Sequence, residues 1–412
     1  MKCFKFFTLI CGIALTLNQC TEKVTGNNEP SPLRDLSSTE RSLTASDNNF
    51  GLKLFRQIVT SESGKNIFIS PLSVSMALGM TYNGADGDTR SEMHSTLEYG
   101  NLTASEVNQS YRSLIDLLST ADDDVTFEIA NSIWYQSGFS VISEFLQLNT
   151  TYFDAVVNAL DFNRSDATDI INAWVSEKTH EKIPTIVDPP IDPYTVMFLI
   201  NAIYFKGTWT YEFEPENTTG ETFYLKDGSQ TTCQMMSHKC DHGYYENNRI
   251  QVADLTYGNV GFSMTVILPK SGIDVDSVVS QMTADNWADW TNNLTETEVN
   301  VFLPKFKLEY NTTLNQVLTA LGMVQAFNPG QANFDKINPD YDLYISSVIH
   351  KTFVDVNEEG TEAAAVTAVT LGTTSIGDHE VYFRVDRPFI FVLREKNSGT
   401  ILFVGKIINP NV

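Results

Sequence analysis

The densest group of potential metal ligands in this chain of 412 residues is one short run of cysteines and histidines. Cys233, His238, Cys240 and His242 follow the spacing C-x4-H-x-C-x-H. Structural zinc sites usually take their ligands from two separated pairs, which this run does not supply. The two cysteines could instead close a disulfide across a hairpin, or stay as two free thiols. We therefore predict no metal and no other cofactor, and leave the state of the thiols open.

Motifs of known catalytic chemistry are absent from the sequence. It contains no G-x-S-x-G, no H-E-x-x-H, no G-x-x-x-x-G-K and no G-x-G-x-x-G after a strand. Asp86-Gly87-Asp88 resembles the start of a calcium loop, but no Glu completes it, so a polar turn is the better reading. We predict that the protein is not an enzyme. The alternative is an active site assembled from distant residues, as in a lipid-anchored hydrolase.

Residues 358–375 have a different kind of potential function, because their composition is that of a β-strand that could add to a sheet. The segment reads EEGTEAAAVTAVTLGTTS and lies between two runs that look like buried strands. With strand periodicity, both of its faces are small or β-branched after Glu362. Such a segment can enter a sheet between two existing strands without overpacking the layer behind them. The simpler alternative is a flexible surface loop rich in Ala and Thr.

Composition and the amino terminus narrow the classes of function. The formal net charge of −24 argues against nucleic acid as a partner, which needs clustered Lys and Arg. Residues 1–20 have a basic start and an apolar run too short to span a bilayer, and therefore look like a signal peptide. Cys20 stands where a bacterial lipoprotein signal has its lipidated cysteine, with plain secretion as the alternative. Residues 21–45 look like a disordered tether.

The elements that must position these residues belong to one domain over residues 46–412. Helices dominate its first half and strands its second, which indicates an α+β fold. Helical periodicity covers residues 46–61, 71–81, 88–97, 104–119, 142–154, 166–179, 275–289 and 312–323. Strand-like runs cover residues 127–135, 196–206, 250–257, 260–268, 298–309, 343–356, 381–385, 389–394 and 400–407.

Six motifs in a fixed order resemble those of the serpins, over about residues 46–410. They are Asn66-Ile67-Phe68-Ile69-Ser70-Pro71, Asn201-Ala202-Ile203-Tyr204-Phe205-Lys206-Gly207-Thr208-Trp209, Leu303-Pro304-Lys305-Phe306, Leu321-Gly322-Met323, Glu358-Glu359-Gly360-Thr361-Glu362-Ala363-Ala364-Ala365 and Arg384-Val385-Asp386-Arg387-Pro388-Phe389. The resemblance implies three β-sheets, eight or nine helices and an exposed reactive-centre loop at about residues 358–380. It also implies a suicide inhibitor of serine proteases, with cysteine proteases as targets of some members. The inhibitor and its protease would form a covalent 1:1 complex.

The resemblance also assigns roles to individual residues. The hinge of the loop would be formed by Glu358, Gly360, Thr361, Ala363, Ala364 and Ala365. Glu358 would pair with Lys305. The region where the central sheet opens would contain Ser70, Ser73, Asn201, Trp209, Lys305 and His350. For Trp209 and His350, ordinary core packing is the alternative.

Counting from the hinge places the reactive bond at Thr374–Ser375, although a shorter loop would place it nearer Gly377. Thr at this position suits an elastase- or subtilisin-like protease with a small apolar pocket, and does not suit a trypsin-like one. A non-inhibitory serpin-fold carrier or chaperone is the alternative function. We expect a monomer that is secreted, periplasmic or at the cell surface.

Overall fold

The computed structural model describes residues 34–362 and 380–411. The predictions for the signal peptide, for Cys20, for Ala363 to Ala365 and for Thr374–Ser375 lie outside these residues. No helix within the two described ranges is long and apolar enough to cross a membrane.

The described residues contain nine α-helices and two turns of 3-10 helix. The α-helices are α1 (Ser38–Ser61), α2 (Pro71–Tyr82), α3 (Gly87–Thr96), α4 (Ala104–Leu118), α5 (Ser143–Phe153), α6 (Ala167–Lys178), α7 (Val275–Val279), α8 (Ala284–Asn292) and α9 (Asn315–Ala320). The single helix predicted over 275–289 is in fact two, α7 and α8. The chain breaks there because the side chain of Thr283 caps a new helix by accepting a hydrogen bond from the backbone N–H of Asn286.

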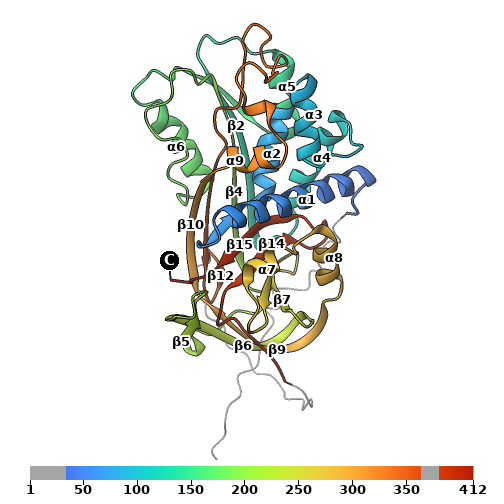
Figure 1. The fold of residues 1–412 in the computed structure, drawn as a ribbon, viewed down its shortest axis with the longest axis vertical. Coiled ribbons are helices and arrows are strands. Elements are labelled where there is room, and N and C mark those ends of the chain that lie inside the picture. Colours follow the sequence, from blue (N-terminus) through green and yellow to red (C-terminus); the bar gives the residue numbers. More distant parts are fainter. Residues whose placement is uncertain (1–33, 363–379, 412) are drawn as a thin grey trace, which may run out of the picture.

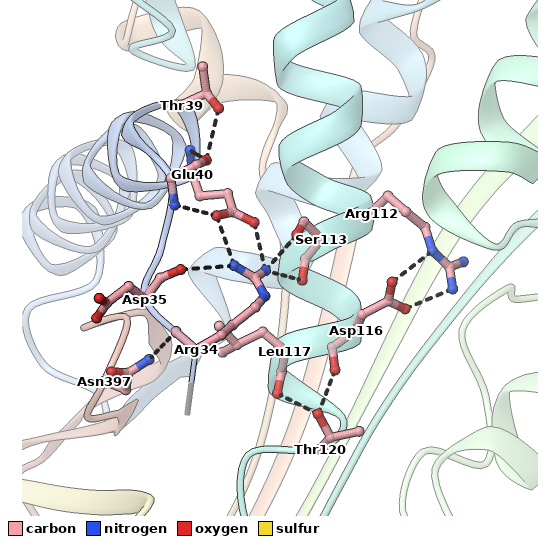
Figure 2. Close-up of polar contacts among 11 residues, drawn as sticks. Arg34, Asp35, Thr39, Glu40, Arg112, Ser113, Asp116, Leu117, Thr120 and Asn397 are labelled. Atoms are coloured by element: carbon pink, nitrogen blue, oxygen red, sulfur yellow. Dashed lines mark hydrogen bonds and ion pairs between the residues drawn. The ribbon is translucent and has the colours of Figure 1, made fainter. Parts of the chain in front are cut away.

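The first helix begins earlier than the sequence indicates, so the prediction of a tether over 21–45 is wrong for residues 38–45. Ser37 and Glu40 form a capping box that starts α1 at Ser38. The guanidinium of Arg34 then binds the Glu40 carboxylate at 2.6 Å and the Ser113 hydroxyl of α4 at 2.5 Å (Figure 2). The composition of this stretch is polar, but its buried face and its cap are those of a helix.

Fifteen strands accompany these helices. They are β1 (Ile67–Ile69), β2 (Val125–Gln136), β3 (Val156–Leu160), β4 (Met197–Thr208), β5 (Thr219–Tyr224), β6 (Gln230–Glu246), β7 (Ile250–Tyr257), β8 (Phe262–Pro269), β9 (Thr295–Pro304), β10 (Phe306–Thr313), β11 (Ile349–Val356), β12 (Gly360–Thr361), β13 (Val381–Arg384), β14 (Phe389–Glu395) and β15 (Ile401–Ile407). The strand-like runs predicted from the sequence did not include β1, β3, β5, β6 or β12, and merged β9 with β10.

The strands of the described residues form a six-stranded and a nine-stranded sheet. The smaller sheet has the order β10-β11-β12-β4-β2-β3. The larger one has the order β1-β15-β14-β8-β7-β6-β9-β13, with β5 paired to β6. The 17-residue strand β6 pairs with β9 over Met235–Tyr244 and with β7 over Gly243–Glu246, and so joins two sheets end to end. Counted on either side of this junction, the nine-stranded sheet makes two, so the described strands form the three sheets of the predicted α+β fold.

Two hydrophobic cores sandwich the six-stranded sheet. The large core lies against α1, α2 and the nine-stranded sheet, and includes Phe50, Leu72 and Phe403. The small core lies on the other face under α6, where Trp134 and Ile200 meet Ile171. Figure 1 shows α6 alone on its side of β2 and β4, with the other helices of this end gathered opposite. Movement of β2 or β4 would therefore disturb the contacts of α6.

Candidate functional site

The six-stranded sheet is incomplete between β4 and β11. The two-residue strand β12 fills only one end of the gap, with Gly360 opposite Thr208 and Thr361 opposite both Gly207 and Val356. Beyond that end, no pairing joins β4 to β11 in the described part of the chain. A cavity of about 270 Å³ opens there, lined by residues of β4, of β11 and of the segment that follows α6.

The prediction of a continuous strand over 343–356 is wrong for residues 343–348. These residues are irregular, and β11 begins only at Ile349. Leu343, Ile345 and Val348 still pack against the core. Their apolar alternation therefore reflects burial. A strand also needs a neighbouring backbone to bond, and the open side of the sheet does not offer one here.

The hinge residues Gly360 and Thr361 are already part of the sheet. Thr361 is 2% exposed, and its hydroxyl oxygen lies 2.7 Å from the hydroxyl of Tyr257. Gly360 has a φ of +156°, and a Cβ at this position would lie 2.0 Å from the backbone oxygen of Gly207. Only glycine therefore allows the chain to pass β4 this closely.

The predicted pair of Glu358 and Lys305 is present, with Nζ and Oε2 2.6 Å apart. The Thr218 hydroxyl donates a second hydrogen bond to the same carboxylate at 2.8 Å. Partial burial of Glu358 works against its ionisation, but the hydrogen bonds from Lys305 and Thr218 outweigh it and lower its pKa. The carboxylate thus anchors the start of the hinge to Lys305, which lies between β9 and β10.

Trp209 closes the end of the opening and holds the hinge backbone. Its indole N–H donates to the carbonyl of Asn357 at 3.0 Å, and its backbone N–H donates to the carbonyl of Glu359 at 2.8 Å. Its ring stacks on Tyr257 with centroids 4.3 Å apart. These bonds exceed ordinary core packing, which was the alternative for Trp209. Nothing in the sequence marks Tyr257 as the residue that links Trp209 to Thr361.

The predicted polar cluster lies at the centre of the sheet, beneath the gap. The Ser70 hydroxyl donates to the carbonyl of Leu402 at 2.7 Å and accepts from the backbone N–H of Ser73 at 3.2 Å. Nε2 of His350 accepts from the backbone N–H of Ser70 at 3.0 Å. The Ser73 hydroxyl donates to the carbonyl of Asn201 at 3.5 Å. The cluster therefore ties β4 and β11 to α2, from opposite sides of the gap.

Burial of His350 lowers its pKa to about 4. Because its Nε2 is an acceptor, the ring is neutral with its proton on Nδ1. The sequence analysis missed Asn131 of β2, which is 1% exposed and accepts from Nδ2 of Asn201 at 2.8 Å. The run 127–135 was predicted as a strand, but nothing in the sequence indicated that its asparagine would pair with Asn201.

The run of cysteines and histidines lies within one strand, β6, so the hairpin disulfide is wrong. Cys233 is a buried free thiol, so it is not bonded to Cys240. His238, Cys240 and His242 do come together, with ligand atoms within 4.8 Å of one another. However, the two Nε2 atoms already share a hydrogen bond of 2.9 Å. Burial lowers the pKa of His242 to about 4 and holds that of His238 well below its usual range.

The six-stranded sheet thus has an open position between β4 and β11, and the first residues of the small-residue segment already pair at one end of it. The model of the serpin (serine protease inhibitor) family matches residues 45–410. The chain belongs to this family.

Known relatives cover nearly the whole domain. Iripin-3 of Ixodes ricinus is 36% identical over 371 residues, which are 89% of this chain and 94% of that protein. The human leukocyte elastase inhibitor is 35% identical, over 89% of this chain and 99% of its own length. The native crystal structure of the thermophilic serpin tengpin has a TM-score of 0.83 and 31% identity, and covers 95% of this chain and 100% of that one.

Proposed function

We propose that this protein is a suicide-type inhibitor of serine proteases that traps the acyl-enzyme by inserting its cleaved loop into the six-stranded sheet. The observation that carries the proposal is β12, because the hinge already pairs with both β4 and β11 at the entrance of the gap. A loop that continued in this direction would enter the gap between these strands. A protein with a closed sheet could not accept it.

The reaction begins as ordinary proteolysis. The serine oxygen of the protease attacks the carbonyl carbon of Thr374, an ester forms, and the amide bond to Ser375 breaks. The new amine of Ser375 leaves with a proton from the catalytic acid of the protease. The residues up to Thr374 are then free to follow Thr361 into the sheet.

The register of β12 sets the path of the inserted strand. Because Thr361 lies opposite Gly207 in an antiparallel pair, continuing the register puts residue 371 opposite Met197, the first residue of β4. From residue 361 to residue 374 the strand would extend by roughly 43 Å at about 3.3 Å per residue. The attached protease would be carried to the far end of the sheet. Deacylation stops if its catalytic groups are displaced by even about 1 Å.

The target is proposed to be an elastase- or subtilisin-like protease. Thr374 would enter its primary pocket, and a small uncharged side chain suits a small apolar pocket. A relative named for inhibiting leukocyte elastase supports this class. A cysteine protease is the second class of target, and the inhibitor is proposed to act as a monomer.

The test is incubation with a panel of serine and cysteine proteases, followed by denaturing gels and mass spectrometry of the cut site. We expect a denaturant-resistant 1:1 complex with an elastase- or subtilisin-like enzyme. If every protease cleaves the loop and leaves active, the carrier or chaperone alternative replaces the inhibitor. If an active-site serine probe labels the protein, the alternative that it is a hydrolase is supported.

Export, with or without a lipid on Cys20, also stays a proposal. It rests on the basic start and the apolar run of the leader. The intact mass of the mature protein would test it, because removal of the leader and addition of a lipid change the mass in opposite directions. A mature protein that retains Met1 would contradict export through this leader.

A further inference from the structure

The chain leaves the sheet abruptly after Thr361. Glu362 has a φ of +60°, in the left-handed region that is costly for a residue with a Cβ. Its backbone N–H still donates to the carbonyl of Asp355 on β11, at 3.0 Å. β12 ends at Thr361, and a strand that continued through Glu362 would require this residue to adopt an extended conformation.

The side chain of Glu362 is held down against the outer face of the sheet. It is only 4% exposed, and its Oε2 lies 3.7 Å from Nζ of Lys182. Tyr204, on β4, lines the same small cavity as Lys182 and Glu362. Burial raises the pKa of Glu362, and Lys182 and Tyr204 oppose that rise. Oε2 is buried and accepts no hydrogen bond from the described residues, so the ion pair with Lys182 is what favours the charged form of Glu362 here.

Lys182 contacts Glu362 from the segment that follows α6. It lies just after α6, where its backbone N–H bonds to the carbonyl of Thr179. Its ammonium group also lies 4.9 Å from the centre of the Phe353 ring on β11. One side chain thus contacts the hinge and β11 while belonging to the segment that covers the sheet.

We propose that Lys182 is a positioning residue that latches Glu362 in its left-handed turn and so restrains further insertion of the hinge. The inference rests on the proposed function, since it concerns the same insertion. The latch opposes premature insertion, in which the uncut loop would be consumed without a protease. It also couples insertion to the segment after α6, which must release Glu362 before the next residues can enter.

The experiment compares Lys182→Met with a matched control, Lys307→Met. Lys307 lies on β10, and its ammonium group is 5.2 Å from the same Phe353 ring, but it belongs to the far side of β11 from the hinge. Both changes remove one charge and one contact with Phe353. Only the first removes the partner of Glu362. Lys182→Arg, which keeps the charge, serves as the rescue variant.

Two measurements need no protease. One is hydrogen exchange of the segment that contains the Glu362 amide. The other is the rate at which the uncut protein converts, below its melting temperature, to a form that resists urea. We expect Lys182→Met to raise both rates about fivefold, as for the loss of one partly buried ion pair. Lys307→Met and Lys182→Arg should stay near the wild type.

A double-mutant cycle with Glu362→Gln completes the test. The combined variant should convert no faster than Lys182→Met alone, because both changes break one contact. Equal rates for Lys182→Met and Lys307→Met, or additive effects in the cycle, would overturn the latch. A protein that shows the latch but traps no protease would refute the proposed function and leave this inference standing.

Discussion

Replacement of Thr361 by arginine tests the proposed mechanism at the first inserted residue. Thr361 is 2% exposed between β4 and β11, and its hydroxyl contacts Tyr257 at 2.7 Å. Arginine would lose that hydrogen bond, worth about 1 kcal/mol, and would bring an unpaired charge into the sheet at a cost of several kcal/mol more. The hinge of the variant should therefore leave the sheet, while the rest of the fold is retained.

The consequence for inhibition follows from a competition between insertion and deacylation. If about 3 kcal/mol of that cost is already present in the transition state for insertion, the activation free energy rises by this amount and insertion slows roughly a hundredfold. Deacylation of the protease does not depend on Thr361 and keeps its rate. Most cleavage events should then release active protease, so that the variant becomes a substrate.

The assay counts inhibitor molecules consumed per protease molecule inactivated, with complex yield read on denaturing gels. Thr361→Ser is the matched control, because it keeps a small side chain with a hydroxyl, and it should behave as the wild type. If Thr361→Arg yields as much complex as Thr361→Ser, then Thr361 does not enter the sheet during trapping, and the register derived from β12 is refuted.

Three further predictions follow from the same geometry. Cleavage of the loop by a protease that is not trapped should raise the thermal unfolding midpoint by roughly 10 °C or more, because the inserted strand gains ladder hydrogen bonds worth about 1 kcal/mol each; equal midpoints before and after cleavage would mean that no strand is inserted. Thr374→Arg should redirect inhibition from elastase to trypsin, measured as association rates with cut-site sequencing, and cleavage at Leu371 or Ile376 with elastase inhibition retained would show that the reactive bond is misplaced. His350 has a folded-state pKa of about 4, below an unfolded value of about 6.5, so the unfolded chain binds more protons between these two pH values. The free energy of unfolding should therefore fall as pH drops through that window, by on the order of 3 kcal/mol. Unfolding of His350→Gln should depend less on pH there, and parallel curves for the two proteins would contradict the assignment.

Much of the candidate site could be read from local sequence. The order of the motifs predicted the fold. The predicted ion pair of Glu358 with Lys305 is present, with Oε2 and Nζ 2.6 Å apart. Glycine at 360 also carries a local signal, since close approach to β4 requires it. The polar cluster around Ser70 and His350 was identified from the resemblance, and the structure supplies its hydrogen bonds.

Other features depend on contacts that sequence patterns do not encode. The start of α1 was not predicted because a Ser- and Thr-rich composition resembles a tether. The capping box of Ser37 and Glu40 could nevertheless have been recognised from the sequence. Residues 343–348 alternate like a strand, yet they make only isolated backbone hydrogen bonds, such as the one from the N–H of Ile345 to the carbonyl of Ala326, and no strand ladder. Period-2 alternation reports which side chains are buried, and it cannot report whether a neighbouring strand exists.

The sequence by itself determined that this chain is a serpin with a small-residue hinge, because the composition of the hinge and the order of the motifs are local properties. Only the tertiary structure decided that Thr361 lies between β4 and β11, that it contacts Tyr257, and that Lys182 lies beside Glu362. These are meetings of residues more than a hundred positions apart in the chain. They follow from which strands pair and which position is left unfilled, and that is settled by the packing of the whole domain.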